Sequence, residues 1–192
     1  MHIAGVDEAG KGPLAGPVVA AAVILNSADK IAGLADSKVL TAKKRSMLAI
    51  QIKQRALAWS VAEVTAAEID QLNIFHAGLL AMQQALLALT ITPDRALIDG
   101  KFIPPDLPFF CEAIVKGDAR FPAISAASIL AKVCRDQKMV QFDREYPCYG
   151  FAQHKGYPTR QHITALHIHG PSLIHRKSFA PVRACLKDAT QP

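Results

Sequence analysis

Four acidic residues follow apolar runs of the sequence in positions where they could share one site. Asp7 and Glu8 form an adjacent pair after HIAGV, Asp99 follows ALI, and Asp118 follows EAIVKG. The apolar runs have the composition of buried strands, so each acid is expected at the end of a strand. Clustered carboxylates repel one another and are driven toward protonation unless a cation compensates. Because hard oxygen ligands select Mg²⁺ or Mn²⁺, the four acids predict a binding site for divalent metal.

Carboxylates from separate strands can hold two such ions about 3.5–4 Å apart, which is the arrangement used for in-line displacement at phosphorus. Successive residues of a regular strand point to opposite faces of the sheet. Asp7 and Glu8 therefore face one site only if the strand ends or bulges between them, and the nearby Gly10 and Gly12 favour an end. The alternative is that each acid is an ordinary turn residue, since Asp before Gly is common in turns. That alternative weakens when the four acids are taken together.

The turn that contains Gly10, Lys11 and Gly12 follows the acidic pair and has the superficial appearance of a phosphate-binding loop. The Walker pattern requires Ser or Thr directly after the lysine, and Gly12 takes that place here. A nucleoside triphosphate site is therefore not expected. Glycine amides are unobstructed by Cβ atoms, so the backbone N–H groups of this turn can approach a ligand closely.

The bulk composition fits one globular domain, 1–192, with a C-terminal tail from about residue 183. Half of the 192 residues are hydrophobic, which argues against disorder, and the formal charge of +6 favours a polyanionic partner such as nucleic acid. The four cysteines form no C-x-x-C pair, so neither a zinc site nor a disulfide framework is indicated. The N-terminus has no signal-peptide pattern, and the run GPVVAAAVIL is too short to span a bilayer. We therefore expect a cytoplasmic protein without membrane contact.

The elements that must position the acids can be read from apolar runs and cap residues. Strands are expected over 2–7, 17–25 and 57–64, and buried strands of the parallel type in RALIDG and FFCEAIVKGD. Helices are expected after Thr41, after Thr65, and over 73–90, 121–146 and about 159–169. Three early strands followed by two strands that alternate with helices describe an α/β domain with a mixed sheet. If the first, fourth and fifth strands are parallel neighbours, their terminal acids converge at one edge of the sheet.

Seven segments, in order along the chain, resemble the characteristic blocks of bacterial ribonuclease HII, the type 2 ribonuclease H. They are GVDEAGKGPLAGPVVAAAVIL, LADSKVLTAKKR, ALIDG, IVKGD, ISAASILAKVCRD, YGFAQHKGYPT and HRKSFAPV, and they extend from about Gly5 to Val182. The resemblance implies a ribonuclease H-like fold, with a five-stranded mixed sheet flanked by helices. It also implies an endonuclease dependent on Mn²⁺ or Mg²⁺ that hydrolyses the RNA strand of RNA/DNA hybrids. Single ribonucleotides embedded in duplex DNA would be cut on their 5′ side, leaving a 5′-phosphate and a 3′-OH.

The same resemblance places the catalytic and metal-binding quartet of the family on Asp7, Glu8, Asp99 and Asp118, the acids that the strand ends also select. The expected reaction is a two-metal phosphodiester hydrolysis. One ion is expected chiefly on Asp7 and Asp99, and the other near Glu8 and Asp118. Asp136 is a weaker candidate for the fourth acid, because a salt bridge is the expected role of an acid deep in a helix beside Arg135.

Substrate-binding roles follow from the resemblance as well. The family usually has Gly-Arg-Gly where this chain has Gly10-Lys11-Gly12, and the turn senses the ribose 2′-OH largely through main-chain atoms. Lysine should preserve that sensing but does not supply a planar bidentate phosphate contact. Tyr157 would stack on the sugar of the nucleotide after the ribonucleotide, or else simply pack on its own domain. The weaker candidates for phosphate contacts are Ser37, Lys38, Ser125 and Ser128.

The histidines give no support to other hydrolase classes. None stands in H-E-x-x-H and the chain has no G-x-S-x-G, so zinc peptidase and serine hydrolase chemistry are not indicated. Five of them are expected at the surface or as helix caps, namely His154, His162, His167, His169 and His175.

Two alternative functions stay open from the sequence. One is a junction resolvase or integrase of the same fold, which would cut DNA without needing a 2′-OH, and the other is a basic module that binds hybrids without cutting them. The type 3 relatives normally carry an additional N-terminal domain, whereas this sequence begins at its first predicted strand, which favours type 2. No clamp-binding peptide is evident near the end of the sequence, so we expect no strong sliding-clamp contact through the tail. A monomer is expected.

Overall fold

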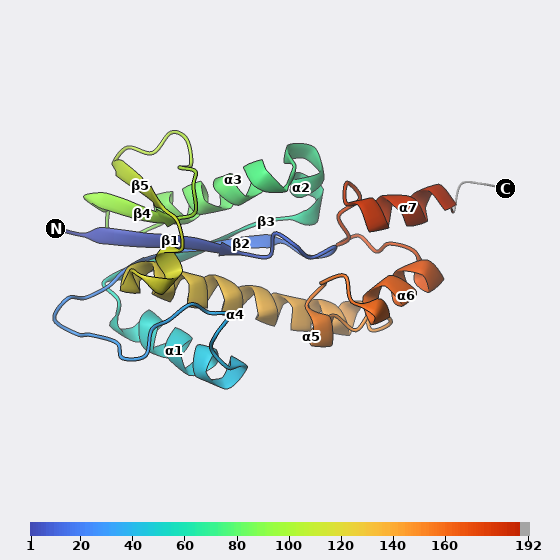
Figure 1. Ribbon diagram of the computed structural model, residues 1–192, viewed down its shortest axis with the longest axis horizontal. Coiled ribbons are helices and arrows are strands. Elements are labelled where there is room, and N and C mark those ends of the chain that lie inside the picture. Colours follow the sequence, from blue (N-terminus) through green and yellow to red (C-terminus); the bar gives the residue numbers. More distant parts are fainter. Residues whose placement is uncertain (189–192) are drawn as a thin grey trace.

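A five-stranded mixed sheet forms the centre of the molecule (Figure 1). The computed structural model describes the backbone of residues 1–188 and the side chains of residues 1–186. The strands are β1 (Ile3–Ala9), β2 (Val18–Ile24), β3 (Ala58–Val64), β4 (Arg95–Asp99) and β5 (Phe110–Ile114). Their order is β3-β2-β1-β4-β5, with β1, β4 and β5 parallel and with β2 antiparallel to both of its neighbours. This arrangement confirms the predicted α/β class and the parallel pairing of the first, fourth and fifth strands.

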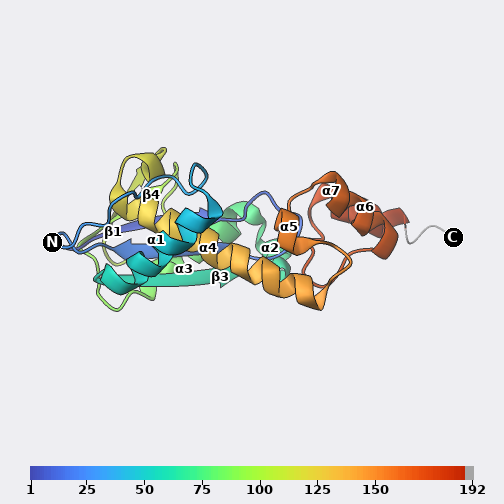
Figure 2. The ribbon, with the colours of Figure 1, turned by 90° about the horizontal axis from the view of Figure 1, so that it is seen from below.

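Helices cover both faces of the sheet. They are α1 (Ala42–Arg55), α2 (Ala66–Leu72), α3 (Ile74–Leu87), α4 (Pro122–Glu145), α5 (Phe151–His154), α6 (Arg160–His169) and α7 (Ala180–Asp188), with a 3₁₀ turn η1 (Gly117–Ala119). Figure 1 shows α2 and α3 on one face and α1 and α4 on the other. The view from below places α1 beside α4 and gathers α5, α6 and α7 at the far end from the N-terminus (Figure 2). We call residues 147–188 the C-terminal lobe.

The predicted helix boundaries agree with the capping residues. Thr41 and Thr65 are N-caps, and Thr65 forms a full capping box with Glu68. Pro122 occupies the first turn of α4, and Gly170 ends α6. The expected tail from residue 183 is helical as far as α7 extends, and its last four residues lie outside the described part of the chain. No helix among the described residues is long and apolar enough to cross a membrane.

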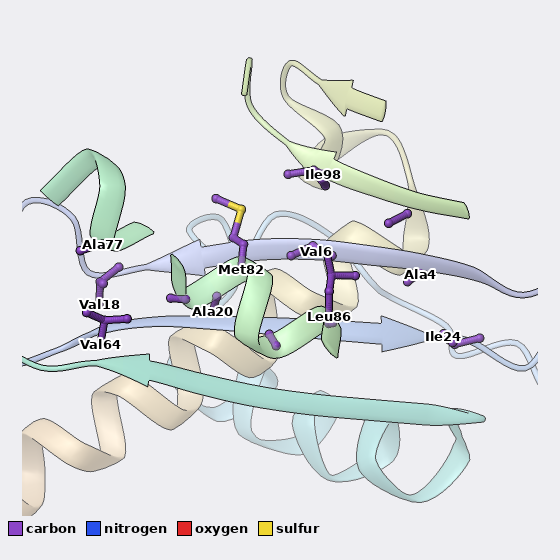
Figure 3. Close-up of a cluster of buried hydrophobic side chains, with 14 of the residues drawn as sticks. Ala4, Val6, Val18, Ala20, Ile24, Val64, Ala77, Met82, Leu86 and Ile98 are labelled. Carbon is purple, nitrogen blue, oxygen red and sulfur yellow. The ribbon is translucent and has the colours of Figure 1, made fainter. Parts of the chain in front are cut away.

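The core lies in two layers because β2 is buried along its whole length and packs on both sides. One layer joins the sheet to α3, and Figure 3 shows its side chains, including Val6, Met82 and Leu86. The other layer joins the sheet to α1 and α4 through Ile52, Ile129 and similar residues. Small residues let these layers approach closely. The extreme case is Gly5, where a Cβ atom would lie 2.1 Å from the carbonyl carbon of Ala123 in α4.

Two predicted strand ends are wrong. β1 continues through Ala9 in regular antiparallel pairing with β2, so it does not end at the acidic pair. β5 stops at Ile114, and Asp118 lies in η1 instead of at a strand end. In both cases the pattern of apolar residues did not predict where the strand ends. Pairing with β2 sets the end of β1, and the hydrogen-bonded turn at η1 follows the end of β5.

Candidate functional site

Three of the four predicted acids converge at the carboxyl edge of the parallel strands. Asp7 lies on β1, Asp99 is the last residue of β4, and Asp118 lies in η1 just after β5. One carboxylate oxygen from each lies within 4.8 Å of the other two. The ladder between β1 and β4 ends at Val6 and Ile98, so the first two acids follow the last paired residues of their strands. The predicted convergence is confirmed for these three.

Backbone amides fix the acids in place. Asp99 accepts hydrogen bonds at Oδ1 from the N–H of Gly117, at 2.7 Å, and from that of Asp118, at 3.4 Å. These bonds fold the segment after β5 back onto β4, and Lys116 adopts a left-handed φ of 56° to make the turn. Asp7 Oδ1 accepts from the N–H of Glu8 at 2.7 Å. Main-chain N–H groups therefore orient two of the three acids.

Burial and mutual repulsion raise the pKa values of two acids of this group. Burial, followed by the charges of Glu8 and Asp99, raises the pKa of Asp7 well above its ordinary value. Burial also raises the pKa of Asp118, and the charges of Asp99 and Asp36 add to the effect. Each carboxylate thus needs a positive charge nearby to stay ionised. A group of buried, mutually repelling carboxylates fits a divalent cation with oxygen ligands.

Glu8 faces the other side of the sheet. The regular pairing of Asp7 with Ala21 and of Glu8 with Ala20 sends the two side chains to opposite faces. Glu8 Oε1 accepts from Lys11 Nζ at 2.5 Å, whereas Oε2 is buried without a hydrogen-bond partner among the described residues. Buried carboxylate oxygens are rarely left without a donor. The three-acid group does not include Glu8, although its charge helps to raise the pKa of Asp7, so its predicted place among the metal ligands stays a prediction.

A cleft of about 270 Å³ adjoins the acids. It is lined by Asp7, Glu8, Ala9, Gly10, Lys11, Gly12, Ser37, Lys38, Ser128, Lys132 and Tyr157. Most of the predicted substrate-binding residues therefore meet in one place. A larger hollow of about 410 Å³ between α1 and α4 has no such group of acids on its walls.

The glycine turn and Tyr157 face each other across this cleft. A Cβ atom built on Gly12 would lie 3.5 Å from Cε1 of Tyr157, at ordinary contact distance. Gly10 has a φ of 99°, and a Cβ atom there would lie 2.1 Å from Nε of Arg135. Glycine is thus required at position 10 by conformation and space, whereas at position 12 it keeps the gap to the tyrosine open.

The predicted serine and lysine contacts divide into two groups. The hydroxyl oxygens of Ser128 and Ser37 are hydrogen-bonded at 2.9 Å, and both residues line the cleft beside Asp7. Burial acts to lower the pKa of Lys38, but the charges of surrounding acids outweigh it and raise that pKa. Ser125 lies outside the cleft, because its hydroxyl donates to the carbonyl of Asp118 at 2.6 Å. Its predicted substrate contact stays a prediction, and its observed contact supports η1.

Several residues of the site were missed from the sequence. Lys132 lines the cleft one helical turn after Ser128, a spacing of four that the predicted helix already contained. Asp36 acts on the acids through its charge. Two buried arginines lie beneath the turn, Arg135 and Arg176, and local sequence gave no signal for either.

Other expectations need correction. Asp136 lies outside the three-acid group and pairs with Lys132 Nζ at 2.8 Å, so its predicted salt bridge exists but does not involve the neighbouring Arg135. His154, His162 and His175 are buried, not at the surface, because their rings pack with Phe151 in the C-terminal lobe.

The two other histidines agree with expectation. His167 and His169 are exposed in the last turn of α6. Cys111, Cys134 and Cys148 are free thiols.

Comparisons with known proteins cover nearly the whole chain. The family model described as Ribonuclease HII matches residues 4–182. A relative named Ribonuclease HII from Marinomonas sp. (strain MWYL1) is 58% identical over 185 residues, which cover 96% of this chain and 93% of the relative. The crystal structure of ribonuclease H2 from Pyrococcus horikoshii OT3 has a TM-score of 0.85 at 26% identity and covers 100% of both chains. A structure of the PCNA:RNase HII complex from Archaeoglobus fulgidus gives 0.78 at 25% identity, covering 94% of this chain and 96% of that one.

Proposed function

This chain belongs to the ribonuclease HII family and is therefore a metal-dependent ribonuclease H endonuclease, and we propose for it a specific reaction. It hydrolyses the RNA strand of RNA/DNA hybrids and cuts on the 5′ side of single ribonucleotides embedded in duplex DNA. The products carry a 5′-phosphate and a 3′-OH. The observation that carries the proposal is the meeting of three carboxylates, within 4.8 Å of one another, beside a cleft bounded by the glycine turn and Tyr157.

Mn²⁺ or Mg²⁺ is the proposed cofactor, held by Asp7, Asp99 and Asp118 with Glu8 beside them. Two bound ions would supply an activated water and would stabilise the charge that develops at the phosphate during in-line hydrolysis. The chain's own contribution is to orient the acids and to bring a positive charge close to them. The amides of Gly117 and Asp118 orient Asp99, and Lys38 brings a positive charge close to the group.

Recognition of the ribonucleotide is assigned to the walls of the cleft. The turn at Gly10, Lys11 and Gly12 presents main-chain groups to the ribose, and the exposed ring of Tyr157 lies opposite. A 2′-OH on the nucleotide that stacks on Tyr157 would crowd the ring, which favours a junction from RNA to DNA. Lys38 and Lys132 stand where strand phosphates would pass, since lysine serves phosphate as a point charge.

Lys11 has a different role from the one that its place in the turn suggests. Its ammonium pairs with Glu8, and its aliphatic stem packs against Gly78 of α3, where a Cβ atom would lie 2.9 Å from Lys11 Cε. The side chain thus points toward the acids and α3. We therefore assign sensing in this turn to the backbone, and phosphate contact to the lysines on the opposite wall.

The test is cleavage of a DNA duplex that contains one ribonucleotide, with an all-DNA duplex of the same sequence beside it. The wild type should cut only the first duplex, at one position, and only with divalent metal. Asp7→Asn and Asp99→Asn should lose at least about 100-fold in kcat yet still bind the duplex, because phosphate contacts come from other residues. Asp29→Asn, an exposed acid far from the site in contact with Arg55, is the control and should cut normally.

The alternative functions give different results in the same assay. Cleavage of the all-DNA duplex would indicate an enzyme of the resolvase or integrase kind. Binding that is insensitive to chelator, with no cleavage after addition of Mg²⁺ or Mn²⁺, would indicate a hybrid-binding module. Full activity of Asp7→Asn or Asp99→Asn would refute the assignment of these acids.

Partners and location stay predictions. We propose a cytoplasmic enzyme that acts as a monomer. The Archaeoglobus fulgidus neighbour was solved in complex with PCNA, so binding of this chain to a sliding clamp should be tested directly. We expect no strong contact through its last ten residues, and a pull-down with and without those residues checks this.

A further inference from the structure

Two arginines are completely buried beneath the glycine turn. Arg135 and Arg176 are both 0% exposed, and neither forms a salt bridge with a described carboxylate. A buried charge without a counter-ion is costly unless many hydrogen bonds satisfy it. Burial lowers the pKa of Arg176 to about 9, which still leaves the guanidinium charged at neutral pH. The structural role of each arginine therefore follows from the groups to which its guanidinium donates hydrogen bonds.

The partners of Arg176 are four carbonyl oxygens of one short segment. Nη2 donates to Gly10 O at 2.6 Å, and Nη1 donates to Lys11 O at 3.0 Å and to Pro13 O at 2.7 Å. Nε donates to Gly16 O at 3.0 Å. All of these acceptors belong to the turn that follows the acidic pair. The side chain thus holds the turn from below at both of its ends.

Arg135 completes the same arrangement. Its Nε donates to Pro17 O at 3.0 Å and its Nη2 donates to Ala15 O at 3.1 Å. Its Nη1 reaches the carbonyl of Lys155, in the segment that leads to Tyr157, at 3.0 Å. Hence Arg176 holds the turn at both of its ends, and Arg135 adds two contacts at the end that leads into β2.

The direction of these carbonyls sets the direction of the amides. In a trans peptide the C=O of one residue and the N–H of the next point in opposite directions. With the carbonyls of Gly10 and Lys11 turned onto Arg176, the N–H groups of Lys11 and Gly12 point away from it. Neither N–H donates a backbone hydrogen bond within the described chain outside its strands and helices, and both residues line the cleft.

The segment around Arg176 also ties the turn to the opposite wall. The N–H of Arg176 donates to Leu14 O at 2.8 Å, and the N–H of Gly16 donates to Ile174 O at 2.9 Å. The N–H of Leu14 in turn donates to Gly156 O at 2.8 Å, next to Tyr157. The width of the cleft between turn and tyrosine is therefore fixed by the same contacts.

We propose that Arg176 is a positioning residue for ribonucleotide recognition, because its guanidinium turns the carbonyls of Gly10 and Lys11 inward and thereby aims two free amides at the ribose 2′-OH. The inference rests on the proposed function. The role requires arginine, and not lysine, at position 176. Five donors in a planar fork can serve four carbonyls at once, whereas the single ammonium of lysine has three donors on one atom.

The experiment compares Arg176→Lys with the wild type on two duplexes that differ only in one 2′ substituent. The first has a single ribonucleotide, and in the second the 2′-OH of that nucleotide is replaced by fluorine. If the amides read the hydroxyl, the wild type loses much of its kcat on the fluorinated duplex. The variant, whose amides are misaligned, should lose about 100-fold in kcat on the ribonucleotide duplex. Its ratio between the two substrates should fall at least tenfold.

That ratio separates positioning from general damage. A purely structural role would lower both rates together and leave the ratio unchanged, and this result overturns the proposal. Arg55→Lys is the matched control. It alters an arginine at the end of α1 that pairs with Asp29, and it should preserve both rates and their ratio. The apparent affinity of Arg176→Lys for Mn²⁺ should stay within about twofold of the wild-type value, since Arg176 touches none of the three acids. Failure of the wild type itself to cut the ribonucleotide duplex would refute the proposed function, and with it the inference.

A second measurement applies even if Arg176→Lys does not fold. In ¹⁵N-labelled Asp99→Asn protein, which is expected to bind without cutting, the amide resonances of Lys11 and Gly12 should shift more with the ribonucleotide duplex than with the all-DNA duplex. Equal shifts with both duplexes would overturn the proposal.

Discussion

Asp7 is the acid of the site under the greatest electrostatic strain. It is 5% exposed, and two neighbouring carboxylates add to the effect of burial on its pKa. Only one hydrogen bond from a side chain, that of Ser128, acts in the opposite direction together with the amide of Glu8. Before a metal can bind, the proton favoured by this environment must leave. Metal affinity should therefore rise with pH.

The raised pKa of Asp7 gives a prediction for stability without metal. The folded protein holds a proton that the unfolded chain releases above about pH 3.9, so the free energy of unfolding should fall as pH rises from there toward neutrality. Asp7→Asn removes this effect, and the metal-free variant should be more stable than the wild type at pH 7.5. Urea denaturation with and without chelator measures the difference.

Addition of metal should reverse the order of the two proteins. At Mn²⁺ concentrations of 100 times its dissociation constant, the wild type should gain about 2.7 kcal/mol. Asp7→Asn should gain much less. Equal gains in both proteins would show that Asp7 is not a ligand.

At the scale of elements, α4 connects the chemistry to the rest of the fold. Its first turn packs on β1 at Gly5, its middle presents Ser128 and Lys132 to the cleft, and Met139 near its end joins the core of the C-terminal lobe. A small shift of this helix relative to β1 would displace the acid on β1 from the serine and lysine opposite.

The contact between β1 and α4 can be tested through Gly5. A methyl group there would lie 2.1 Å from the backbone of Ala123, and backbone atoms have little freedom to move aside. Gly5→Ala should therefore lower the free energy of unfolding by about 1–3 kcal/mol. Gly12→Ala is the control for stability, because its methyl group would meet Tyr157 at 3.5 Å and its φ is not left-handed. Its change should stay within about 0.5 kcal/mol, and a similar loss in both variants would contradict the packing argument.

The sequence predicted elements well where local signals define them. Thr41, Thr65 and Pro122 mark helix starts through caps, and apolar runs located every strand of the sheet. It failed where tertiary contacts decide. β1 is prolonged past Asp7 by its partner strand, and Asp118 reaches the site through a turn held by Asp99.

The same distinction applies to the site. Asp7 and Asp99 could be predicted because each follows the last paired residue of one of two neighbouring parallel strands, which meet at one edge of the sheet. Arg176 could not be predicted, because its partners are carbonyl oxygens, which every residue has, at positions far away along the chain.

At the scale of the molecule, the C-terminal lobe is built around buried imidazoles. His162 Nε2 lies 3.0 Å from His175 Nε2, and the other nitrogen of His162 bonds the carbonyl of Tyr157 at 2.9 Å. Burial, and then the neighbouring His162, lower the pKa of His175 to about 4. Protonation of these two rings should therefore destabilise the lobe that carries Tyr157.

Acid should therefore weaken the lobe in a defined range of pH. The unfolded chain takes up a proton near pH 6.5 and the folded chain only near pH 4, so stability present above pH 6.5 is lost as pH falls, by on the order of 3 kcal/mol. His175→Gln keeps a donor near Nε2 without a titratable group, and its stability should fall less over this range. The titration of Asp7 acts with the opposite sign, but it is common to both proteins and cancels in their difference.

Urea denaturation from pH 7 to pH 4 measures this difference between wild type and His175→Gln. Parallel curves for the two proteins would show that His175 does not govern the acid response.

The contact between Arg176 and Gly10 also links catalytic competence to completion of protein synthesis. The two residues are 166 positions apart, so the turn is among the first parts of the chain to be made and the last to be locked. Asp118 is the last of the four acids to be made, so at about 5–20 residues per second a nascent chain spends roughly 3–12 s with all its acids present and its recognition turn not yet held by Arg176. A chain that ends before this arginine would carry the four acids without the contacts that orient the turn, so we expect it not to select a ribonucleotide.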